Sequence, residues 1–359
     1  MKLVAPIKLV TSKAQRDELL NTLSSVNLMC NWLSAQAFSA KEFHTFGLQK
    51  RSYHEARSRF GVSAQLTIRA VSKVCDAYKV NRLKQSVFSS RGGIGYDLKS
   101  YSLKIERVGL CTTKGYLRLP YTCGPHQRRL LEGKRGEAKL VYRGGQFYLY
   151  ISVEAPVEPL QPSKGFLGVD LGINTIAADS DGVRYSGDAT RKKRERMSAL
   201  KSDLQSCGTR SAKRHLKRLS GHESNFNKHT NHEISKALVS KAKGTGRGIA
   251  VENLTGITHR VTVRKAQRAA LHSWSFYQIK TFILYKATLS GVQVVEVNPA
   301  YTSQTCPECG CVSRKNRPSQ AVFLCIKCGY EAHADFVGAR NIATRALVGG
   351  PIVTGVDTQ

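Results

Sequence analysis

The first 160 residues change from a strand-like pattern to a helical one and back again. Residues 1–10 alternate loosely between apolar and polar side chains, which predicts a strand. Ser12 and Gln15 then have the spacing of a helix capping box, and apolar side chains recur every three or four residues as far as Ala37. The same periodicity predicts a second helix from Ser63 to Leu83. We expect both apolar stripes to pack into a core.

A glycine-rich break at residues 89–97 separates these helices from a run of short predicted strands. The strands cover residues 101–106, 116–119, 138–142 and 146–154. A glycine pair between the last two is typical of a hairpin turn. Three prolines in residues 154–164 then predict a linker.

A second domain is predicted from Gly165 onward. Strand-like runs and turns come first, and residues 187–247 follow with a mostly helical pattern. Glycines in residues 244–248 precede a short apolar run, which predicts a loop before a strand and not a phosphate-binding helix start. Residues 269–289 then predict a long helix, and residues 292–297 predict a buried strand.

The charge of the chain limits the classes of partner. A length of 359 residues suggests two or three globular units, and a hydrophobic content of 41% excludes a fully disordered chain. The formal net charge is +31, from 56 Lys+Arg against 25 Asp+Glu, and residues 187–247 alone hold 16 Lys+Arg against 5 Asp+Glu. Such a charge repels itself unless a polyanion neutralises it. Nucleic acid is therefore the leading candidate partner, and an anionic membrane surface is the second.

The sequence shows no membrane-spanning or export signal. No apolar run approaches the ~18–20 residues that a transmembrane helix needs, and the start of the chain lacks the apolar core of a secretory signal. We therefore expect a location in the reducing cytosol. There, five scattered cysteines are expected to pack as small hydrophobic side chains: Cys30, Cys75, Cys111, Cys123 and Cys207.

Two Cys-x-x-Cys pairs predict a metal site. Cys306 and Cys309 form the first pair, Cys325 and Cys328 form the second, and fifteen residues separate the pairs. This spacing is typical of a zinc ribbon, in which four thiolates surround Zn²⁺ and leave no open position, so the ion is structural. A glycine after each pair lets the backbone turn toward the sulfurs. Cys311 is an alternative ligand with less favourable spacing, and four reduced thiols without metal would leave a long loop with few apolar anchors.

Three acidic residues stand at the ends of apolar elements. Asp170 and Glu252 each end an apolar strand, and Asp335 begins a predicted helix. A carboxylate buried there is costly unless it meets a cation, which is either a metal ion or a Lys or Arg side chain. A ribonuclease-H-like fold would bring all three together. In such folds two divalent ions between carboxylates promote phosphodiester cleavage, and the hard oxygen ligands favour Mg²⁺.

Four motifs together carry a resemblance to a known family. They are GVDLGINTIA at 168–177, IAVENLTGI at 249–257, NPAYTSQTCPECG at 298–310 and CGYEAHADFVGARNIATRA at 328–346. In order and spacing they resemble the RuvC motifs and zinc ribbon of the TnpB family, RNA-guided nucleases of bacterial insertion sequences that are related to compact type V CRISPR effectors. The resemblance covers about residues 165–346, and residues 1–160 match only in general layout.

The resemblance implies an α+β multidomain protein. A β-barrel wedge domain (1–10 and 96–160) would be interrupted by a helical recognition domain (11–95). A RuvC-like nuclease domain with a ribonuclease-H α/β fold (165–300 and 333–348) would carry the basic helical insertion 187–247 and a four-cysteine zinc ribbon (301–332), before a flexible tail (349–359).

The resemblance also implies an activity and a set of site residues. Asp170, Glu252 and Asp335 would be the catalytic triad that binds two Mg²⁺ ions. Arg340 and Asn341 fall on the family's Ala-Arg-Asn stretch, and Arg340 is expected either to contact the scissile phosphate or to form a salt bridge within its helix. The implied protein is a metal-dependent RNA-guided DNA endonuclease of a mobile element. Its guide RNA pairs with double-stranded target DNA beside a short flanking motif. Residues 187–247 would be a lid or contact nucleic acid; the alternative is a solvated helical face.

Other functions remain open from the sequence. They are a compact CRISPR effector, a nuclease-silent RNA-guided DNA-binding regulator, a transposase that joins strands itself, and a basic zinc-ribbon protein that binds structured RNA. The presence of all three acids argues against a silent regulator, and the last alternative gives no reason for acids on apolar strands. RNA that co-purifies with the protein would argue against the transposase. We expect a bacterial, nucleoid-associated protein in the cytoplasm, and monomer and dimer both remain open.

Overall fold

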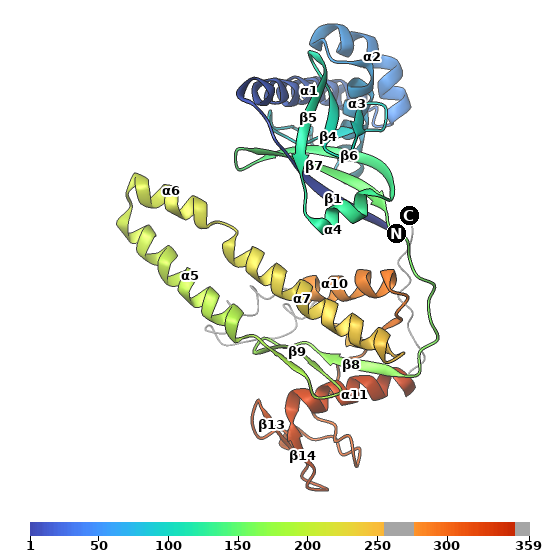
Figure 1. Cartoon of the computed structure of the whole chain (residues 1–359), viewed down its shortest axis with the longest axis vertical. Helices are drawn as coiled ribbons and strands as arrows, with labels where there is room; N and C mark the ends of the chain where they lie inside the picture. Colours follow the sequence, from blue (N-terminus) through green and yellow to red (C-terminus); the bar gives the residue numbers. More distant parts are fainter. Residues whose placement is uncertain (255–275, 349–359) are drawn as a thin grey trace. The chain divides into compact units, whose positions relative to one another are not determined.

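The computed structural model describes residues 1–254 and 276–348 (Figure 1). The chain divides into two compact units, with the boundary in the sequence between Pro156 and Val157. The tail predicted at 349–359 and the first part of the helix predicted at 269–289 lie outside the described residues. Within the described part of the chain, no helix combines the length and the apolar character needed to cross a membrane.

The first unit is built on a seven-stranded antiparallel sheet in the order β2-β6-β7-β1-β5-β4-β3. Its strands are β1 (Lys2–Leu9), β2 (Ile94–Tyr96), β3 (Tyr101–Leu103), β4 (Arg107–Thr112), β5 (Gly115–Thr122), β6 (Lys134–Arg143) and β7 (Gln146–Glu154). Side chains join the edge strand β3 to β6: the Tyr101 hydroxyl donates to the Gly136 carbonyl at 2.7 Å, and Arg135 Nη1 donates to the Leu103 carbonyl at 2.9 Å. The sheet is therefore a nearly closed β-barrel.

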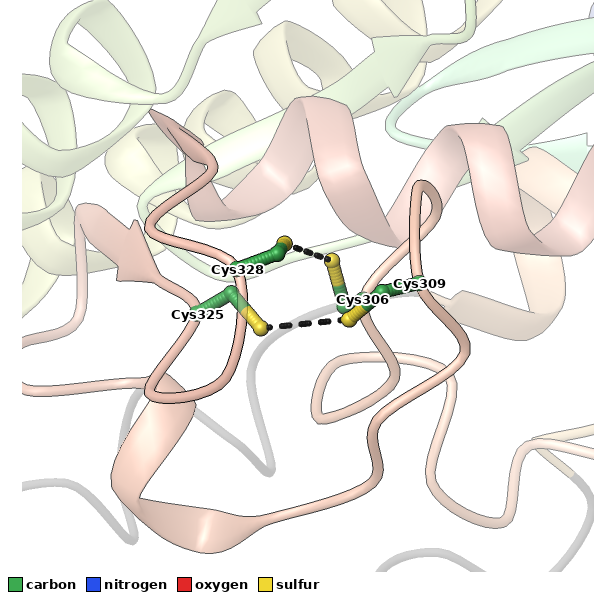
Figure 2. Close-up of side chains that lie close together, drawn as sticks. All are labelled: Cys306, Cys309, Cys325 and Cys328. Atoms are coloured by element: carbon green, nitrogen blue, oxygen red, sulfur yellow. Dashed lines mark hydrogen bonds between the residues drawn. The ribbon is translucent and has the colours of Figure 1, made fainter.

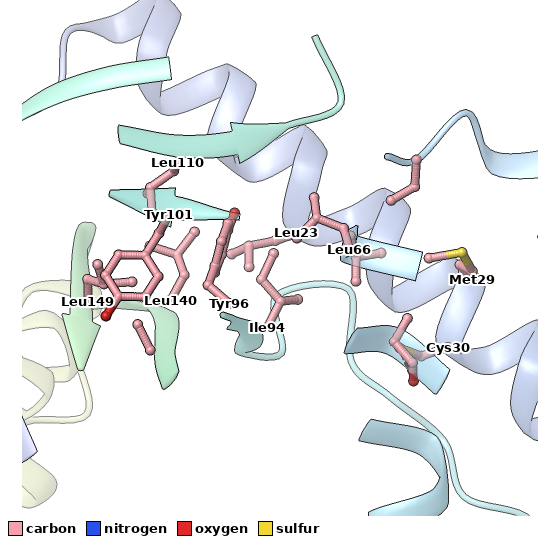
Figure 3. Close-up of a cluster of buried hydrophobic side chains, with 14 of the residues drawn as sticks. Leu23, Met29, Cys30, Leu66, Ile94, Tyr96, Tyr101, Leu110, Leu140 and Leu149 are labelled. Carbon is pink, nitrogen blue, oxygen red and sulfur yellow. Dashed lines mark hydrogen bonds between the residues drawn. The ribbon is translucent and has the colours of Figure 1, made fainter. Parts of the chain in front are cut away.

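Three helices lie between β1 and β2 in the sequence: α1 (Lys13–Ala40), α2 (Thr45–Phe60) and α3 (Ala64–Val80). α1 begins with the predicted capping box, in which the side chains of Ser12 and Gln15 each accept the other's backbone N–H. Figure 3 shows how the buried side chains of the helices, such as Leu23, continue into those of the strands, such as Leu140. Helices and sheet therefore share one hydrophobic core.

Several elements of this unit were missed by the sequence analysis. β2 lies inside the predicted glycine-rich break, β4 follows a turn within the region predicted as one strand at 101–106, and the short helix α4 (Pro125–Leu131) was not predicted. α2 was not predicted individually, because it buries Leu48, Ser52 and Ala56, which give only a weak apolar stripe. The glycine pair at 144–145 does form the predicted hairpin turn, with φ values of 58° and 79°.

The proline-rich segment after β7 packs on the second unit. The Glu158 backbone N–H donates to the Leu289 carbonyl at 3.2 Å, and its carboxylate pairs with Lys243 at 2.6 Å. The Lys164 backbone N–H donates to the Gly246 carbonyl at 2.9 Å. The boundary between the two units lies within the predicted linker, and residues 158–164 are held on the second unit by these hydrogen bonds and this ion pair.

The second unit contains a five-stranded sheet in the order β10-β9-β8-β11-β12. The strands are β8 (Phe166–Asp170), β9 (Thr175–Asp179), β10 (Arg184–Ser186), β11 (Gly248–Glu252) and β12 (Val294–Val297). β8, β11 and β12 are parallel to one another, β9 is antiparallel to β8, and β10 is antiparallel to β9. The loop before β11 is as predicted.

Helices cover both faces of this sheet. α7 (His222–Gly244) and α10 (Phe276–Leu289) share a core with Leu167 and Val169 of β8, whereas α11 (Ala334–Val348) packs on the opposite face with Phe166 (Figure 1). Because side chains alternate along a strand, Asp170 lies on the α11 face. Glu252 lies on the same face, since its strand has the matching register.

The predicted basic insertion at 187–247 consists of two different parts. α5 (Asp188–Cys207) and α6 (Arg210–Leu219) run side by side away from the sheet, and Met197 and Ala212 are the buried residues of these two helices (Figure 1). The second half of α7, in contrast, enters the core through Leu238. Cys207 is exposed at the end of α5, so the prediction that it packs as a hydrophobic side chain is wrong. Cys30 and Cys75 are buried as predicted, and Cys111 and Cys123 are half-buried.

A small substructure lies between β12 and α11 in the sequence. It consists of the 3₁₀ turn η1 (Arg314–Asn316) and a two-stranded antiparallel sheet of β13 (Val322–Leu324) and β14 (Glu331–His333). Phe323 of this sheet shares a buried cluster with Val337 of α11. The substructure therefore packs on the same helix that covers β8.

Two glycines let α11 approach β8 closely. A Cβ atom at Gly168 would overlap the backbone carbonyl oxygen of Ala339, and a Cβ atom at Gly338 would lie 2.9 Å from Oδ2 of Asp170. Real Cβ atoms essentially never come so close to backbone or carboxylate atoms. The carboxylate of Asp170 therefore lies directly against the helix.

We predict that Gly168→Ala destabilises the second unit by about 1–3 kcal/mol, because the added methyl group would push α11 away from the sheet. Gly244→Ala is the matched control, since a Cβ atom there meets no atom within 4 Å. Thermal unfolding of both variants checks the prediction. An unchanged unfolding midpoint for Gly168→Ala would show that the helix approaches the strand less closely than described.

Candidate functional site

Asp170 and Glu252 lie beside each other at one edge of the sheet. β8 and β11 are parallel neighbours, and their register pairs Val169 with Val251. The next residue of each strand is a carboxylate on the α11 face. The carboxyl ends of parallel strands meet at the same edge of a sheet, which is the usual place for ligand sites in open α/β sheets.

α11 brings the third acid to this edge. Asp335 lies in the first turn of α11, where its backbone N–H donates to Nδ1 of His333 at 3.2 Å. Gly338, one turn later, lies against the Asp170 carboxylate. The charges of both Glu252 and Asp335 act on Asp170. The fold therefore brings together three acids that are far apart in the sequence.

The surroundings of Asp170 disfavour its charged form. Burial is the largest cause, repulsion by Glu252 and Asp335 adds to it, and together they raise the pKa of Asp170 to about 7. The positive charge of Arg317 and a hydrogen bond from the Leu171 backbone act in the opposite direction. Without a bound cation, Asp170 is therefore partly protonated at neutral pH.

Glu252 has neighbours of its own that stabilise its charge. Burial raises the pKa of Glu252, whereas a hydrogen bond from Thr302 and the positive charge of Arg345 lower it. The Thr302 hydroxyl oxygen lies 2.5 Å from Oε1 of Glu252. Thr302 was not among the residues predicted for the site, although it belongs to one of the four motifs.

Arg317 was also missed by the sequence analysis. It follows η1 in the polar loop before the second cysteine pair, where no periodic pattern marks it. Its Nη2 donates to the Gln320 carbonyl at 3.0 Å, and its charge acts on Asp170. Arginine is well suited to phosphate because its guanidinium presents several fixed donors. The arginine whose charge acts on Asp170 thus comes from the cysteine-rich segment.

Arg340 of α11 forms hydrogen bonds with the cysteine-rich segment. Its Nη1 donates to Oε1 of Glu308 at 3.1 Å and to the hydroxyl of Tyr330 at 3.2 Å. Glu308 stands between Cys306 and Cys309 and not on α11, so the alternative of a salt bridge within the helix is wrong. Contact of Arg340 with a scissile phosphate stays a prediction; the two hydrogen bonds use only Nη1 of its guanidinium.

The four predicted cysteines converge on one point (Figure 2). The Sγ atoms of Cys306 and Cys328 are 3.6 Å apart, those of Cys309 and Cys325 are 3.5 Å apart, and all four lie within 4.8 Å of one another. A tetrahedral ion with bonds of about 2.3 Å to sulfur would space its ligands by about 3.8 Å. The cluster therefore fits a four-coordinate metal. Across the described ranges 1–254 and 276–348, the three carboxylates do not form such a compact set.

The backbone around the cysteines also suits thiolates. Gly310 and Gly329 have φ values of 69° and 73°, and each backbone N–H donates back to the first cysteine of its pair at 3.0 Å. Backbone hydrogen bonds, chiefly from Cys328, lower the pKa of Cys325 to about 6. Cys311 lies outside the sulfur cluster and contributes its carbonyl oxygen, which accepts the Cys306 N–H at 2.9 Å. Cys309 is thus in the ligand position, as predicted.

Asn316 joins the two cysteine pairs. It is fully buried, and its Nδ2 donates to the carbonyls of Gln304 and Cys311 at 3.0 Å each. Its Oδ1 accepts the backbone N–H of Ile326, within the second pair, at 3.1 Å. No sequence pattern marks this asparagine, because its role depends on two loops that meet only in the fold.

We predict that Asp170→Asn stabilises the metal-free protein in a pH-dependent way. The folded-state pKa of about 7 lies above the ordinary 3.8. The stability that this group contributes is therefore fully present below about pH 4 and is lost as the pH rises through about 7. Asparagine removes that loss, so the variant should unfold at least about 3 °C above the wild type at about pH 8 in magnesium-free buffer.

The difference should shrink as the pH falls toward about 5. Asp203→Asn, on the exposed part of α5, is the control and should show no such pH dependence. Thermal unfolding between about pH 5 and about pH 8 measures both variants. A constant difference between Asp170→Asn and the wild type across this range would contradict the raised pKa.

Two family models match the chain. Residues 150–257 match the model described as "Probable transposase", and residues 276–342 match "Cas12f1-like, TNB domain". The second match contains all four cysteines and Asp335, and the first contains Asp170 and Glu252.

Relatives from several organisms match part of the chain. A CRISPR-associated endodeoxyribonuclease Cas12f1 of Sulfoacidibacillus thermotolerans is 34% identical over 219 residues, 56% of this chain and 50% of that protein. A putative RNA-guided DNA endonuclease InsQ of Escherichia coli is 31% identical over 214 residues, 55% and 53% of the two chains. A putative transposase of Methanocaldococcus jannaschii is 32% identical over 83 residues, which cover 21% of this chain and 75% of that protein. The chain spans about half the length of the first two.

The fold is also similar to that of a solved structure. The structure of a Cas12f1-sgRNA-target DNA complex aligns with a TM-score of 0.58 at 14% identity, over 91% of this chain and 82% of that one. The two family models, the relatives and the position of the three acids agree with the resemblance of the four motifs. The chain therefore belongs to the TnpB family of probable transposases, to which the Cas12f proteins are related.

Proposed function

We propose that this chain is an RNA-guided DNA endonuclease whose RuvC-like domain hydrolyses a phosphodiester with two Mg²⁺ ions. The observation that carries the proposal is the convergence of Asp170, Glu252 and Asp335 at one sheet edge. The strand order β10-β9-β8-β11-β12, with three parallel strands and helices on both faces, supports a ribonuclease-H fold. The names of the InsQ and Cas12f1 relatives support the activity.

The donor set suits divalent ions with a preference for oxygen. Two of the acids repel Asp170, so a cation between the three carboxylates would be favourable, and hard oxygen ligands favour Mg²⁺. When bound, the two ions would neutralise the charge that develops on the attacking and leaving oxygens. The chain's own residues would hold and orient the reacting groups. Thr302 fixes Glu252, Asp170 lies against Gly338, and Arg317, whose charge acts on Asp170, would bind a phosphate oxygen.

α6 supports nucleic-acid binding by the projecting helices. Its basic side chains recur at helical spacing on one face, and its buried residue is Ala212. In the described part of the chain, none of these basic residues forms an ion pair with a carboxylate. They are Arg210, Lys213, Arg214, Lys217 and Arg218. Unpaired charges at this spacing suit a phosphate backbone, so this face of α6 would contact the guide or the target.

The first unit and the four-cysteine cluster would have separate roles. The β-barrel and helices of the first unit would act as wedge and recognition domains, which bind the guide and read the flanking motif. The protein would be bacterial and cytoplasmic, and it would associate with the nucleoid. The four-cysteine cluster would hold one structural Zn²⁺, since four sulfurs at this spacing leave no open position.

A compact CRISPR effector is the second candidate, because two of the relatives are named Cas12f1 and match 56% and 45% of the chain. The two candidates share the cleavage chemistry and differ in the source of the guide. Sequencing the RNA that co-purifies with the protein distinguishes them: a transposon-end sequence supports the first, and a CRISPR repeat supports the second.

Asp170→Ala should abolish cleavage and leave binding of guide and target nearly intact. The loss should exceed about 100-fold, which is more than the removal of an outer-shell partner of a metal site usually costs. Binding should persist because it depends on basic surfaces and base pairing. The measurement pairs cleavage of a guide-matched duplex with its retention on a gel, both with Mg²⁺.

The exposed Asp203→Asn serves as the charge-matched control and should cleave normally. An Asp170→Ala protein that still cuts would remove this residue from the mechanism. One that neither cuts nor binds would show that Asp170 has a folding role.

Cys325→Ser should reduce the zinc content from one ion per chain to near zero and lower the unfolding temperature, because zinc binding contributes directly to the folding of such small substructures. Cys311→Ser is the matched control in the same substructure, and it should retain the ion because its sulfur lies outside the cluster. Elemental analysis of freshly purified, unchelated protein measures both. Equal zinc in wild type and Cys325→Ser would refute the assignment.

A further inference from the structure

One loop connects the candidate acid site, the four-cysteine substructure and α11. Residues 298–305 run from the end of β12 to the first cysteine pair. Thr302, in the middle of this loop, is only 4% exposed. Its hydroxyl oxygen lies 2.5 Å from Oε1 of Glu252 and 3.0 Å from the Pro299 carbonyl oxygen. The hydroxyl has a single proton, and an ionised carboxylate is the stronger acceptor, so the proton goes to Glu252.

Asn341 of α11 holds the loop in place. Its side chain is nearly buried, at 6% exposure, and its Nδ2 donates to the carbonyls of both Thr302 and Thr305 at 2.7 Å. Arg345, one turn further along α11, donates to the Asn298 carbonyl at 2.8 Å. The loop is therefore tied to the helix at three of its carbonyls, and Thr302 has little freedom to move away from Glu252.

The backbone of the loop is itself constrained. Tyr301 has a φ of 63°, in the left-handed region that large side chains rarely adopt. Its carbonyl accepts the backbone N–H groups of Gln304 and Thr305 at 3.0 and 3.1 Å, and the Thr305 hydroxyl at 2.8 Å. A strained residue persists only where its surroundings fix it. The turn that contains Thr302 is thus fixed both by its own hydrogen bonds and by those from Asn341.

We infer that Thr302 is a positioning residue that sets the orientation of the Glu252 carboxylate for divalent-ion binding, and that Asn341 acts through Thr302 from α11. The inference rests on the proposed function, because it assumes that Glu252 is a metal ligand. Thr302 leaves Oε2 of Glu252 free to bind an ion, while Oε1 is held by the hydroxyl. Partners of metal ligands orient the ligand in this way, and their loss typically weakens metal affinity by about 10–100-fold.

The test measures Mn²⁺ binding to the full-length protein freed of nucleic acid, by the electron paramagnetic resonance of unbound Mn²⁺. Thr302→Val removes the hydroxyl with little change in shape, and we expect at least about 10-fold weaker Mn²⁺ binding. Thr302→Ser keeps the hydroxyl and should restore the affinity. Zinc content and target retention should stay at the wild-type level in both variants, which separates a positioning role from general misfolding.

Thr305→Val is the matched control, because it removes a threonine hydroxyl of the same loop that donates to the Tyr301 carbonyl and not to Glu252. It should bind Mn²⁺ as the wild type does. Wild-type affinity in Thr302→Val, or an equal loss in Thr305→Val, would overturn the inference.

Glu252→Gln separates the inference from the proposal beneath it. If Glu252→Gln loses Mn²⁺ binding and Thr302→Val does not, only the inference fails. If Glu252→Gln binds Mn²⁺ as tightly as the wild type, the proposed metal site fails and the inference fails with it.

Discussion

The direct contact between α11 and β8 is the constraint on which the candidate site depends. Because position 168 has no side chain, the backbone of the helix lies against the strand, and Asp170 is pressed against Gly338. The same helix carries Asp335 in its first turn and Asn341 further along. Its position therefore determines the separation of two acids and the place of the loop that supports the third. A bulkier interface would still bury apolar area, but it would move the carboxylates apart.

The site is electrostatically unfavourable without a cation. Burial raises the pKa values of both Asp170 and Glu252, and repulsion by the other two acids raises that of Asp170 further; Arg317 and Arg345 offset these effects only in part. Such a group of acids lowers the stability of the fold and is retained where it binds something positive. The chain has a net charge of +31, so many lysines and arginines are available for pairing. The negative charge of the three acids is nevertheless only partly compensated, which favours a bound cation at this edge of the sheet.

The four-cysteine substructure also contributes to the acid site. It places the charge of Arg317 at Asp170, and its leading loop presents Thr302 to Glu252. Asn316 ties its two cysteine pairs together, and Arg340 binds it to α11 through Glu308. A small polar segment with few apolar side chains can hold these groups in place only if its own fold is fixed, which gives a physical reason for a metal there.

The sequence by itself determined the residue types and their local settings. The cysteine spacing, the acids at the ends of apolar runs, the capping box at Ser12 and the hairpin at 144–145 follow from short-range patterns, and the structure agrees with each. Strands without alternation and helices with a weak apolar stripe, such as β2 and α2, were missed for the same reason.

Only the tertiary structure decided which side chains meet. Arg317, Thr302 and Asn316 lie in polar loops, and their partners are distant in the sequence. Arg340 has the right motif but pairs with Glu308, because the cysteine-rich loop folds back onto α11. The parallel register of β8 and β11 and the close approach of α11 result from packing over the whole unit, and no local pattern in the sequence encodes them.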